Sequence, residues 1–392
     1  MFNFKRGISL LLIALILFST NFVYAQNQGF DVEAKSAILM EFETGQVLFR
    51  KNENLELPPA SITKIMTLLL TAEALEDGEA SLDDEVEISS FAESMGGSQA
   101  WLAEGEEYPL EDILKAVVLP SANDACVALA EHIGGTEQNF VRMMNRRAKE
   151  LGLEHTHFVN TTGLPVEHGE HYTSAHDIAV MAQKLIEVYP EILQFSSKRV
   201  DYIKDGKLRI YTTNNLVGHY PGADGIKTGW TEEAEYCLAG TAKRGERRLI
   251  SVVMKTDSQN ARVEQSAKLL DYGFKAFYKA NLIGPQTQID DKIKVQGGKK
   301  LEVPVATAQG FSAVIKRGTK ELVQRKVETV DKLEAPVKKG AAAGKIVFVH
   351  EDDPENPLGE VELVTTKKVE KANIFVRIFR WLKEFIFGFF NK

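Results

Sequence analysis

The sequence predicts a chain in which helices and strands mix first and a smaller all-β region follows. Three observations predict this organisation. A long apolar helical run follows Pro58-Pro59, a meander of antiparallel strands occupies residues 225–254, and from about residue 283 short β-rich runs alternate with Gly- and Lys-bearing turns. With 392 residues, 44% of them hydrophobic, the chain is long enough to build two cores.

The first helix carries the motif Ser61-Ile62-Thr63-Lys64. Because apolar residues occur all round this helix, and prolines and Gly78 mark its two ends, we expect it to be buried in a domain. Ser61 would lie in the first turn with Lys64 on the same face, within reach of the hydroxyl. The free backbone N–H groups of this first turn would stabilise the oxyanion that forms during the reaction. The alternative is an N-capping serine followed by a surface lysine.

The second motif, Ser121-Ala122-Asn123, interrupts a helical pattern. Residues 111–118 predict a helix, Pro120 ends it, and a helical pattern resumes over 124–132. A serine and an asparagine held in a tight turn between two helices would both point into one cleft. The alternative is ordinary turn chemistry, which these residue types also favour.

The third motif, Lys227-Thr228-Gly229, belongs to the first strand of the predicted meander, residues 225–231. A lysine and a threonine on an edge strand, with a glycine that allows close backbone approach, would pair with an extended peptide. The alternative is a charged edge strand that protects itself from aggregation.

These three motifs, in this order and with their flanks, resemble those of the penicillin-recognising serine D-alanyl-D-alanine carboxypeptidases, the low-molecular-mass penicillin-binding proteins. The resemblance is close over about residues 30–280 and looser beyond. It implies an α/β fold of the β-lactamase/transpeptidase type, with a five-stranded antiparallel sheet, flanking helices and a helical lobe. It also implies removal of the last D-alanine from peptidoglycan stem pentapeptides, inhibition by β-lactam antibiotics, and a role in cell-wall remodelling. One departure is Glu235, where the family usually has glycine.

Residue chemistry assigns a role to each candidate. Ser61 would be the nucleophile and Lys64 its base, which requires a lysine pKa lowered by burial and by a neighbouring cation, Lys227. Ser121 would relay a proton to the leaving amine, and no metal or cofactor is needed. Asn123 would hold either the substrate backbone or Lys64. The other candidates would hold the substrate or flank the oxyanion; they are Thr228, Gly229, Trp230 and, by the resemblance alone, Arg262.

The N-terminus predicts export. Lys5-Arg6, the apolar stretch 8–18 and a small-residue ending at Ala25 are typical of a signal peptide over residues 1–25. A serine peptidase domain would then occupy residues 26–282. The net charge of −8 without a basic patch argues against nucleic acid as a partner.

The remaining residues predict a small β-sandwich at 283–370 and an amphipathic helix at 371–392. Polar residues of the helix fall on one stripe and the segment is locally cationic, which suits a helix lying on a membrane surface. The alternative is a helix packed on a partner protein or on its own domain. We therefore expect a protein held on the outer face of the bacterial cytoplasmic membrane.

Three rival functions are weighed against the carboxypeptidase. Zinc catalysis is one, since five histidines occur within 155–176, although no H-E-x-x-H motif accompanies them. A β-lactamase would use the same three motifs, and a catalytically weak penicillin-binding wall regulator would keep the fold without turnover. Cys126 and Cys237 allow one disulfide, but we expect two buried free thiols.

Overall fold

The computed structural model describes residues 30–167 and 170–380. The predicted signal peptide, residues 1–25, and the end of the predicted amphipathic helix, residues 381–392, lie outside the described residues. No helix within the described part of the chain is long and apolar enough to cross a membrane.

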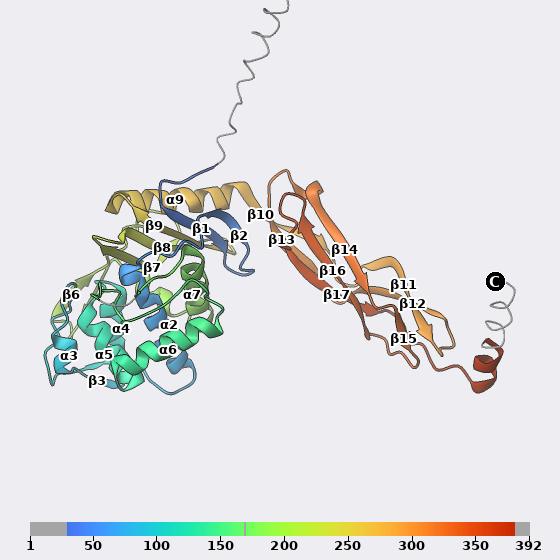
Figure 1. The fold of residues 1–392 in the computed structure, drawn as a ribbon, viewed down its shortest axis with the longest axis horizontal. Helices are drawn as coiled ribbons and strands as arrows, with labels where there is room; N and C mark the ends of the chain where they lie inside the picture. The colour runs from blue at the N-terminus through green and yellow to red at the C-terminus, as the bar shows by residue number, and fades with distance from the viewer. Residues whose placement is uncertain (1–29, 168–169, 381–392) are drawn as a thin grey trace, which may run out of the picture. The chain divides into compact units, whose positions relative to one another are not determined.

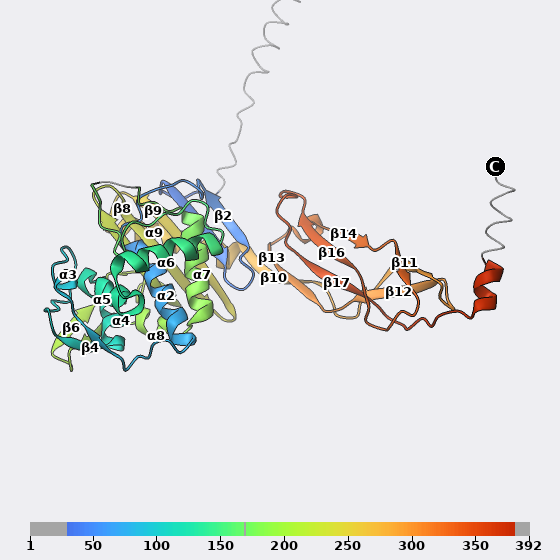
Figure 2. The same ribbon diagram turned by 60° about the horizontal axis from the view of Figure 1, so that its bottom comes forward.

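A five-stranded antiparallel sheet organises the first domain, with the strand order β2-β1-β9-β8-β7. Its strands are β1 (Ser36–Glu41), β2 (Val47–Lys51), β7 (Ala223–Thr231), β8 (Glu235–Arg244) and β9 (Arg247–Thr256). The predicted meander is therefore confirmed, and β7, which carries Lys227-Thr228-Gly229, is an edge strand as expected. Helix α9 (Gln259–Ala276) lies on one face of the sheet, and α7 (Ala175–Val188) lies on the other (Figures 1 and 2).

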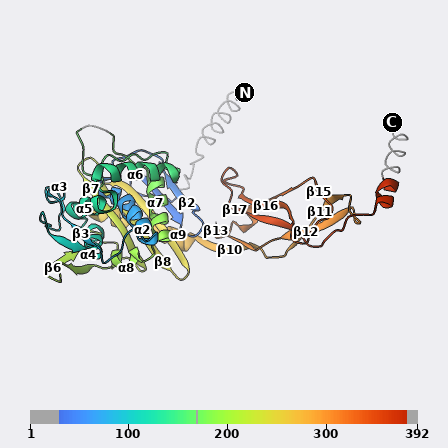
Figure 3. The same cartoon turned by 90° about the horizontal axis from the view of Figure 1, so that it is seen from below.

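A helical lobe packs beyond α7, as Figure 3 shows from below. Its central helix, α2 (Lys64–Glu76), buries ten of its thirteen residues, which confirms the burial predicted from apolar residues all round the helix. The lobe and its connections comprise η1 (Ala60–Thr63), β3 (Glu85–Glu87), α3 (Ser90–Glu93), β4 (Glu107–Pro109), α4 (Leu110–Val118), α5 (Asn123–Gly134), α6 (Glu137–Glu150), α8 (Ile192–Ser196), β5 (Val200–Ile203) and β6 (Leu208–Tyr211).

The second domain is all β, as predicted. One sheet has the order β14-β16-β17-β12-β11-β15, and β10 pairs with β13 in a second. Its core includes Val303, Leu363 and the stacked rings of Phe311 and Phe348, 5.0 Å apart. Its elements are β10 (Phe277–Ile283), β11 (Gln288–Gln296), β12 (Glu302–Thr307), β13 (Phe311–Lys316), η2 (Lys320–Leu322), β14 (Val323–Thr329), β15 (Lys332–Glu334), β16 (Ala342–His350) and β17 (Gly359–Thr365).

Two details refine the sequence expectations. Strand β10 starts at Phe277 and pairs with β13, so we propose that the domain boundary lies just before residue 277 rather than at 282/283. Residues 374–380 are helical, within the segment predicted as an amphipathic helix. On this turn of helix Phe375 and Phe379 are 79% and 69% exposed.

Candidate active site

A short 3-10 turn, η1, presents Ser61 at the start of α2. The sequence placed Ser61 in the first α-helical turn, whereas the α-helix itself begins at Lys64. Ala60, just before the serine, has a left-handed backbone with φ 48°, which is rare for a residue with a side chain. Gly163 makes room for this bend, because a Cβ atom at Gly163 would lie 1.8 Å from the carbonyl oxygen of Ala60.

Lys64 joins the first two motifs. Its Nζ lies 3.0 Å from Ser61 Oγ, 3.3 Å from Ser121 Oγ and 2.6 Å from Asn123 Oδ1. The lysine is fully buried, whereas Ser61 keeps partial exposure. One amine thus contacts both hydroxyls that the sequence predicted to react, and one amide holds that amine in place.

The second motif lies where α4 ends and α5 begins. Ser121 has φ 65°, a second left-handed residue in the site, and it follows Pro120, where no helix can continue. Asn123 belongs to the first turn of α5 rather than to the turn before it. Its Nδ2 donates to Gly96 O at 2.7 Å, so its Oδ1 is oriented toward Lys64.

Asp124 is a buried residue of this site that the sequence interpretation missed. Its carboxylate accepts backbone N–H groups of Ala100 at 3.0 Å and Leu102 at 3.2 Å. The same loop, residues 96–102, accepts the Asn123 backbone N–H at Ser98 O, 2.7 Å away. Asp124 therefore fixes the loop that in turn positions Asn123. An acidic residue directly after the motif, in the first turn of a helix, was the available signal.

The third motif brings a second buried lysine. Lys227 is 1% exposed, and its Nζ donates to the backbone oxygen of Thr228 at 3.3 Å. The Thr228 hydroxyl lies 2.7 Å from that of Thr213, another residue missing from the sequence interpretation. Gly229 lets β7 approach the nucleophile turn, since a Cβ there would lie 2.6 Å from Pro59 O.

The Trp230 side chain is exposed, whereas the Arg262 side chain is buried. The Trp230 side chain is 54% exposed beside Tyr236, with ring centroids 6.1 Å apart. Arg262 is 5% exposed and donates from Nη1 to Gly229 O at 3.2 Å and from Nη2 to Thr213 O at 3.4 Å. Its guanidinium also lies over the Tyr236 ring, 5.6 Å from the centroid, and its Nε has no hydrogen-bond partner within the described chain.

Burial sets the protonation of the two lysines. It lowers the pKa of Lys64 from 10.5 to about 8, against the opposing effects of Cys126 and Asp124. Burial also lowers the pKa of Lys227 far below its usual value, and the charges of Lys64 and Arg262 lower it further. The charge of Lys64 thus opposes protonation of Lys227, whereas the lowered pKa of Lys64 comes from burial rather than from the neighbouring cation predicted from the sequence. A neutral lysine is therefore accessible near neutral pH.

A family model of D-alanyl-D-alanine carboxypeptidases matches residues 22–258, and a model of the C-terminal domain of penicillin-binding protein 5 matches residues 277–371. The chain belongs to the D-alanyl-D-alanine carboxypeptidase family. This places it among cell-wall hydrolases of the penicillin-binding class.

Individual relatives match most of the chain. The D-alanyl-D-alanine carboxypeptidase DacF of Bacillus subtilis is 40% identical over 370 residues, which are 91% of this chain and 94% of the relative. The structure of penicillin-binding protein 5 from Haemophilus influenzae is 30% identical, with a TM-score of 0.75 over 87% of this chain and 99% of that one. Penicillin-binding protein D2 from Listeria monocytogenes, in its ampicillin-bound form, is 32% identical, with a TM-score of 0.58 over 62% and 98%.

Glu235, the departure from the family pattern, lies where β8 begins, paired with Thr231 of β7. It has φ 52°, a conformation that glycine adopts more easily. Its carboxylate lies 3.6 Å from Lys255 Nζ on β9. In this carboxypeptidase the extra side chain therefore forms an ion pair with the neighbouring strand.

The four described histidines among those considered as zinc ligands, His155, His157, His171 and His176, have other partners. His171 Nε2 lies 2.8 Å from Thr63 Oγ1, and its Nδ1 accepts the N–H of Val159 at 3.3 Å. Burial lowers the pKa of His171 to about 4, so the ring is neutral. Residues 30–167 and 170–380, which leave out His168, contain no group of three His, Cys, Asp or Glu side chains placed to hold a metal ion.

Cys126 and Cys237 are both buried free thiols, as expected. The Cys126 Sγ atom donates to Thr161 O at 3.2 Å. Burial raises the pKa of both thiols, which keeps them protonated and unreactive at neutral pH.

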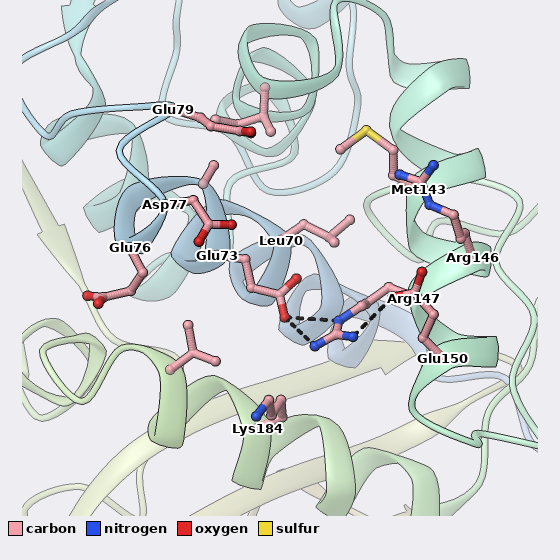
Figure 4. A pocket seen from close by; sticks show the side chains of 13 residues that line it. Leu70, Glu73, Glu76, Asp77, Glu79, Met143, Arg146, Arg147, Glu150 and Lys184 are labelled. Atoms are coloured by element: carbon pink, nitrogen blue, oxygen red, sulfur yellow. Dashed lines mark hydrogen bonds and ion pairs between the residues drawn. The ribbon is translucent and has the colours of Figure 1, made fainter.

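A hollow of the lobe, about 770 Å³, is remote from this chemistry (Figure 4). It is lined in part by the C-terminal half of α2. Glu73, one of the lining residues, lies nine residues, about 14 Å of helix, beyond Lys64. Arg147 donates from Nε and Nη2 to Glu73 at 2.9 and 2.7 Å, and from Nη1 to Glu150 at 3.1 Å. These mutually satisfied charges fit a structural link between α2 and α6.

Proposed function

We propose that this protein removes the terminal D-alanine from peptidoglycan stem pentapeptides ending in D-Ala-D-Ala, through an acyl-enzyme on Ser61. The observation that carries the proposal is that one buried amine, Lys64 Nζ, contacts both Ser61 Oγ and Ser121 Oγ. A lysine whose pKa is lowered to about 8 is a competent general base near neutral pH.

In the first step Ser61 Oγ attacks the carbonyl carbon of the penultimate D-alanine while neutral Lys64 takes its proton. The negative oxygen that forms lies between the backbone N–H groups of Ser61 and Trp230. Lys227 and the Thr228 hydroxyl hold the substrate's terminal carboxylate, and Gly229 allows the peptide to lie against β7. Arg262 acts through the backbone of Gly229, which supports this binding strand from behind.

In the second step the C–N bond breaks and the departing D-alanine amine receives a proton through Ser121, which contacts Lys64. An ester between Ser61 and the shortened peptide remains. Water then attacks that ester, its proton passes to Lys64, and Ser61 recovers its hydroxyl hydrogen as the peptide leaves. No metal or cofactor takes part in the scheme.

The same geometry supports inhibition by β-lactam antibiotics. A β-lactam carbonyl would acylate Ser61 as the peptide does, but its leaving group stays tethered, which slows hydrolysis of the ester. The ampicillin-bound form of the related Listeria protein supports this extension.

We further propose that the protein is exported and held at the outer face of the cytoplasmic membrane by its C-terminal segment. The exposed Phe375 and Phe379, with Arg377 on the same described turns, support this location. Arg380 instead donates to the backbone oxygens of Gly298 at 2.8 Å and Lys299 at 3.1 Å, which joins the start of the helix to the β domain. Aromatic rings beside cationic side chains suit the interface between lipid headgroups and acyl chains.

Labelling with fluorescent penicillin tests the proposal, with Ser61→Ala beside the unchanged protein and D-alanine release measured on acetylated D-Ala-D-Ala peptides. We expect a stable label that Ser61→Ala abolishes, together with D-alanine release. A label that disappears within seconds would indicate a β-lactamase, and a stable label without D-alanine release would indicate a regulator. A folded protein that takes no label at all would refute the serine mechanism.

A further inference from the structure

Thr213 joins the second and third motifs although it belongs to neither. Its backbone N–H donates to Leu119 O at 3.1 Å, and Leu119 lies two residues before Ser121. Its hydroxyl lies 2.7 Å from Thr228 Oγ1 on β7. One residue between β6 and β7 is therefore held against both the stretch that leads to Ser121 and the substrate-binding strand.

The segment that carries Thr213 is held in place although it is neither helix nor strand. The Arg262 guanidinium donates to Thr213 O at 3.4 Å and to Gly229 O at 3.2 Å, which ties this segment to β7. Within the segment, Thr212 Oγ1 accepts the Asn214 N–H at 3.1 Å. These contacts fix the Thr213 hydroxyl beside that of Thr228.

The direction of the hydrogen bond between the two hydroxyls follows from counting hydrogens. A hydroxyl has one hydrogen and a carboxylate has none, so Thr228 has to donate its own hydrogen to the terminal carboxylate of the substrate. The hydrogen between the two threonines then comes from Thr213. The other acceptor for Thr213 is Leu119 O, which is 3.4 Å from the hydroxyl and already accepts the Thr213 N–H. Thr213 therefore loses little when its hydrogen turns to Thr228.

This donation matters because Thr228 is only 5% exposed. Without Thr213, a bound carboxylate would leave the Thr228 oxygen with an unpaired acceptor site shielded from water, which weakens binding. A hydroxyl that accepts one hydrogen bond also donates a stronger one. A C-terminal carboxamide behaves differently, since its NH₂ group can itself donate to the Thr228 oxygen.

We propose that Thr213 is a positioning residue that, through the Thr228 hydroxyl, selects peptides with a free C-terminal carboxylate. The inference rests on the proposed function, since it assumes that Thr228 binds that carboxylate. Lys227 supplies positive charge to the same group, whereas Thr213 sets the direction of the hydrogen bond. The selection therefore depends on a residue outside all three motifs.

Two substrates test this role, diacetyl-lysyl-D-Ala-D-Ala and the same peptide with a C-terminal carboxamide. The values of kcat and KM for release of D-alanine or D-alaninamide are measured in the full chain. Thr213→Val keeps the shape without the hydroxyl. It should lower kcat/KM for the carboxylate peptide about three- to tenfold, the range for one hydrogen bond, and for the carboxamide less than about twofold.

The loss should lie in KM, because the departing D-alanine takes the carboxylate away before the ester is hydrolysed. Thr213→Ser keeps a hydroxyl and should restore the preference for the carboxylate. Both peptides meet the same protein sample, so misfolded protein lowers both rates equally and leaves their ratio unchanged.

Thr212→Val is the matched control, because it removes a hydroxyl from the adjacent residue, where the hydroxyl accepts the Asn214 N–H. It should change the rates with both peptides by the same factor. Equal losses for the two peptides in Thr213→Val, or the same change of ratio in Thr212→Val, would overturn the inference. If no peptide releases its last residue, the proposed function fails. Competition of each peptide with labelling by fluorescent penicillin then still decides whether Thr213→Val weakens binding of the carboxylate more than of the carboxamide.

Discussion

Lys64 governs the reaction at the scale of single residues, and its lowered pKa has a direct consequence. Only the neutral amine can accept the Ser61 proton, so acylation should accelerate about tenfold per pH unit below pH 8 and level off above it. The acylation rate with fluorescent penicillin, measured from pH 6 to 10, checks this. A midpoint near 10.5, the usual lysine pKa, would contradict the role of burial.

Asp124 should affect the pH dependence of acylation although it is not one of the reacting groups. Its charge raises the pKa of Lys64, so Asp124→Asn should shift the acylation midpoint to lower pH. It should also lower the free energy of unfolding by about 1.5–3 kcal/mol, because a charged acceptor of backbone N–H groups is lost. Asp124→Glu keeps the charge and should keep the midpoint even if it is less stable. Identical midpoints in all three proteins would assign Asp124 a purely structural role.

The reacting residues could be predicted because their spacing is local. Ser61 and Lys64 are three residues apart at the start of one helix, and Lys227 and Thr228 are neighbours on one strand. Asp124 and Thr213 were missed because their roles depend on contacts with residues distant in sequence. The hydrogen bonds from Ala100 and Leu102 to Asp124 join a loop to a helix without any periodic signal.

At the scale of elements, η1 depends on the loop that contains Gly163. An added methyl group there would collide with Ala60 O, so Gly163→Ala should displace Ser61 and slow penicillin acylation at least about tenfold. Gly152→Ala is the control, because Gly152 has a similar φ of 70° but no atom within 4 Å of the added carbon.

The control should lose only about 1–2 kcal/mol of stability, the usual cost of a left-handed residue, and should acylate normally. Urea denaturation measures the free energy of unfolding of both variants, and so separates the cost of backbone strain from the effect of the collision on Ser61. Similar acylation rates in the two variants would show that the nucleophile turn does not need the close approach.

Strand prediction succeeded for the apolar run at the centre of β9 and failed for β14, which has no apolar face. Residues 249–254 are apolar almost throughout, and they form the buried centre of β9. Strand β14, Val323–Thr329, was missed because six of its seven residues are exposed, which leaves no alternation to recognise. Its pairing with β16, residue by residue from Val323 to Thr329, defines it instead.

At the scale of the whole molecule, substitutions in the C-terminal helical turn should change membrane binding without changing the stability of the fold. Because Phe375 and Phe379 are largely exposed, replacing both with serine should change the free energy of unfolding by less than about 0.5 kcal/mol. The same change should weaken binding to anionic lipid vesicles at least about tenfold, since each ring would bury apolar area in the interface.

Vesicle flotation of the full chain measures this binding. Tyr202→Ser is the control, an exposed aromatic residue of the catalytic domain whose loss should leave flotation unchanged. Unaltered flotation of the double variant would refute an anchoring role of these two rings and favour a helix packed on a partner protein or on its own domain.

The edge position of β7 has a consequence for when the reaction stops. Thr228 and Trp230 lie two residues apart on one strand. The strand therefore fixes the distance between the site of the peptide's terminal carboxylate and the site where the peptide bond is cut. After one cut, the new carboxylate lies at the height of Trp230 rather than at the height of Thr228. A second cut would require the product to slide by one residue, which reverses the face of every side chain. The enzyme should therefore trim one D-alanine from each stem and release the tetrapeptide intact.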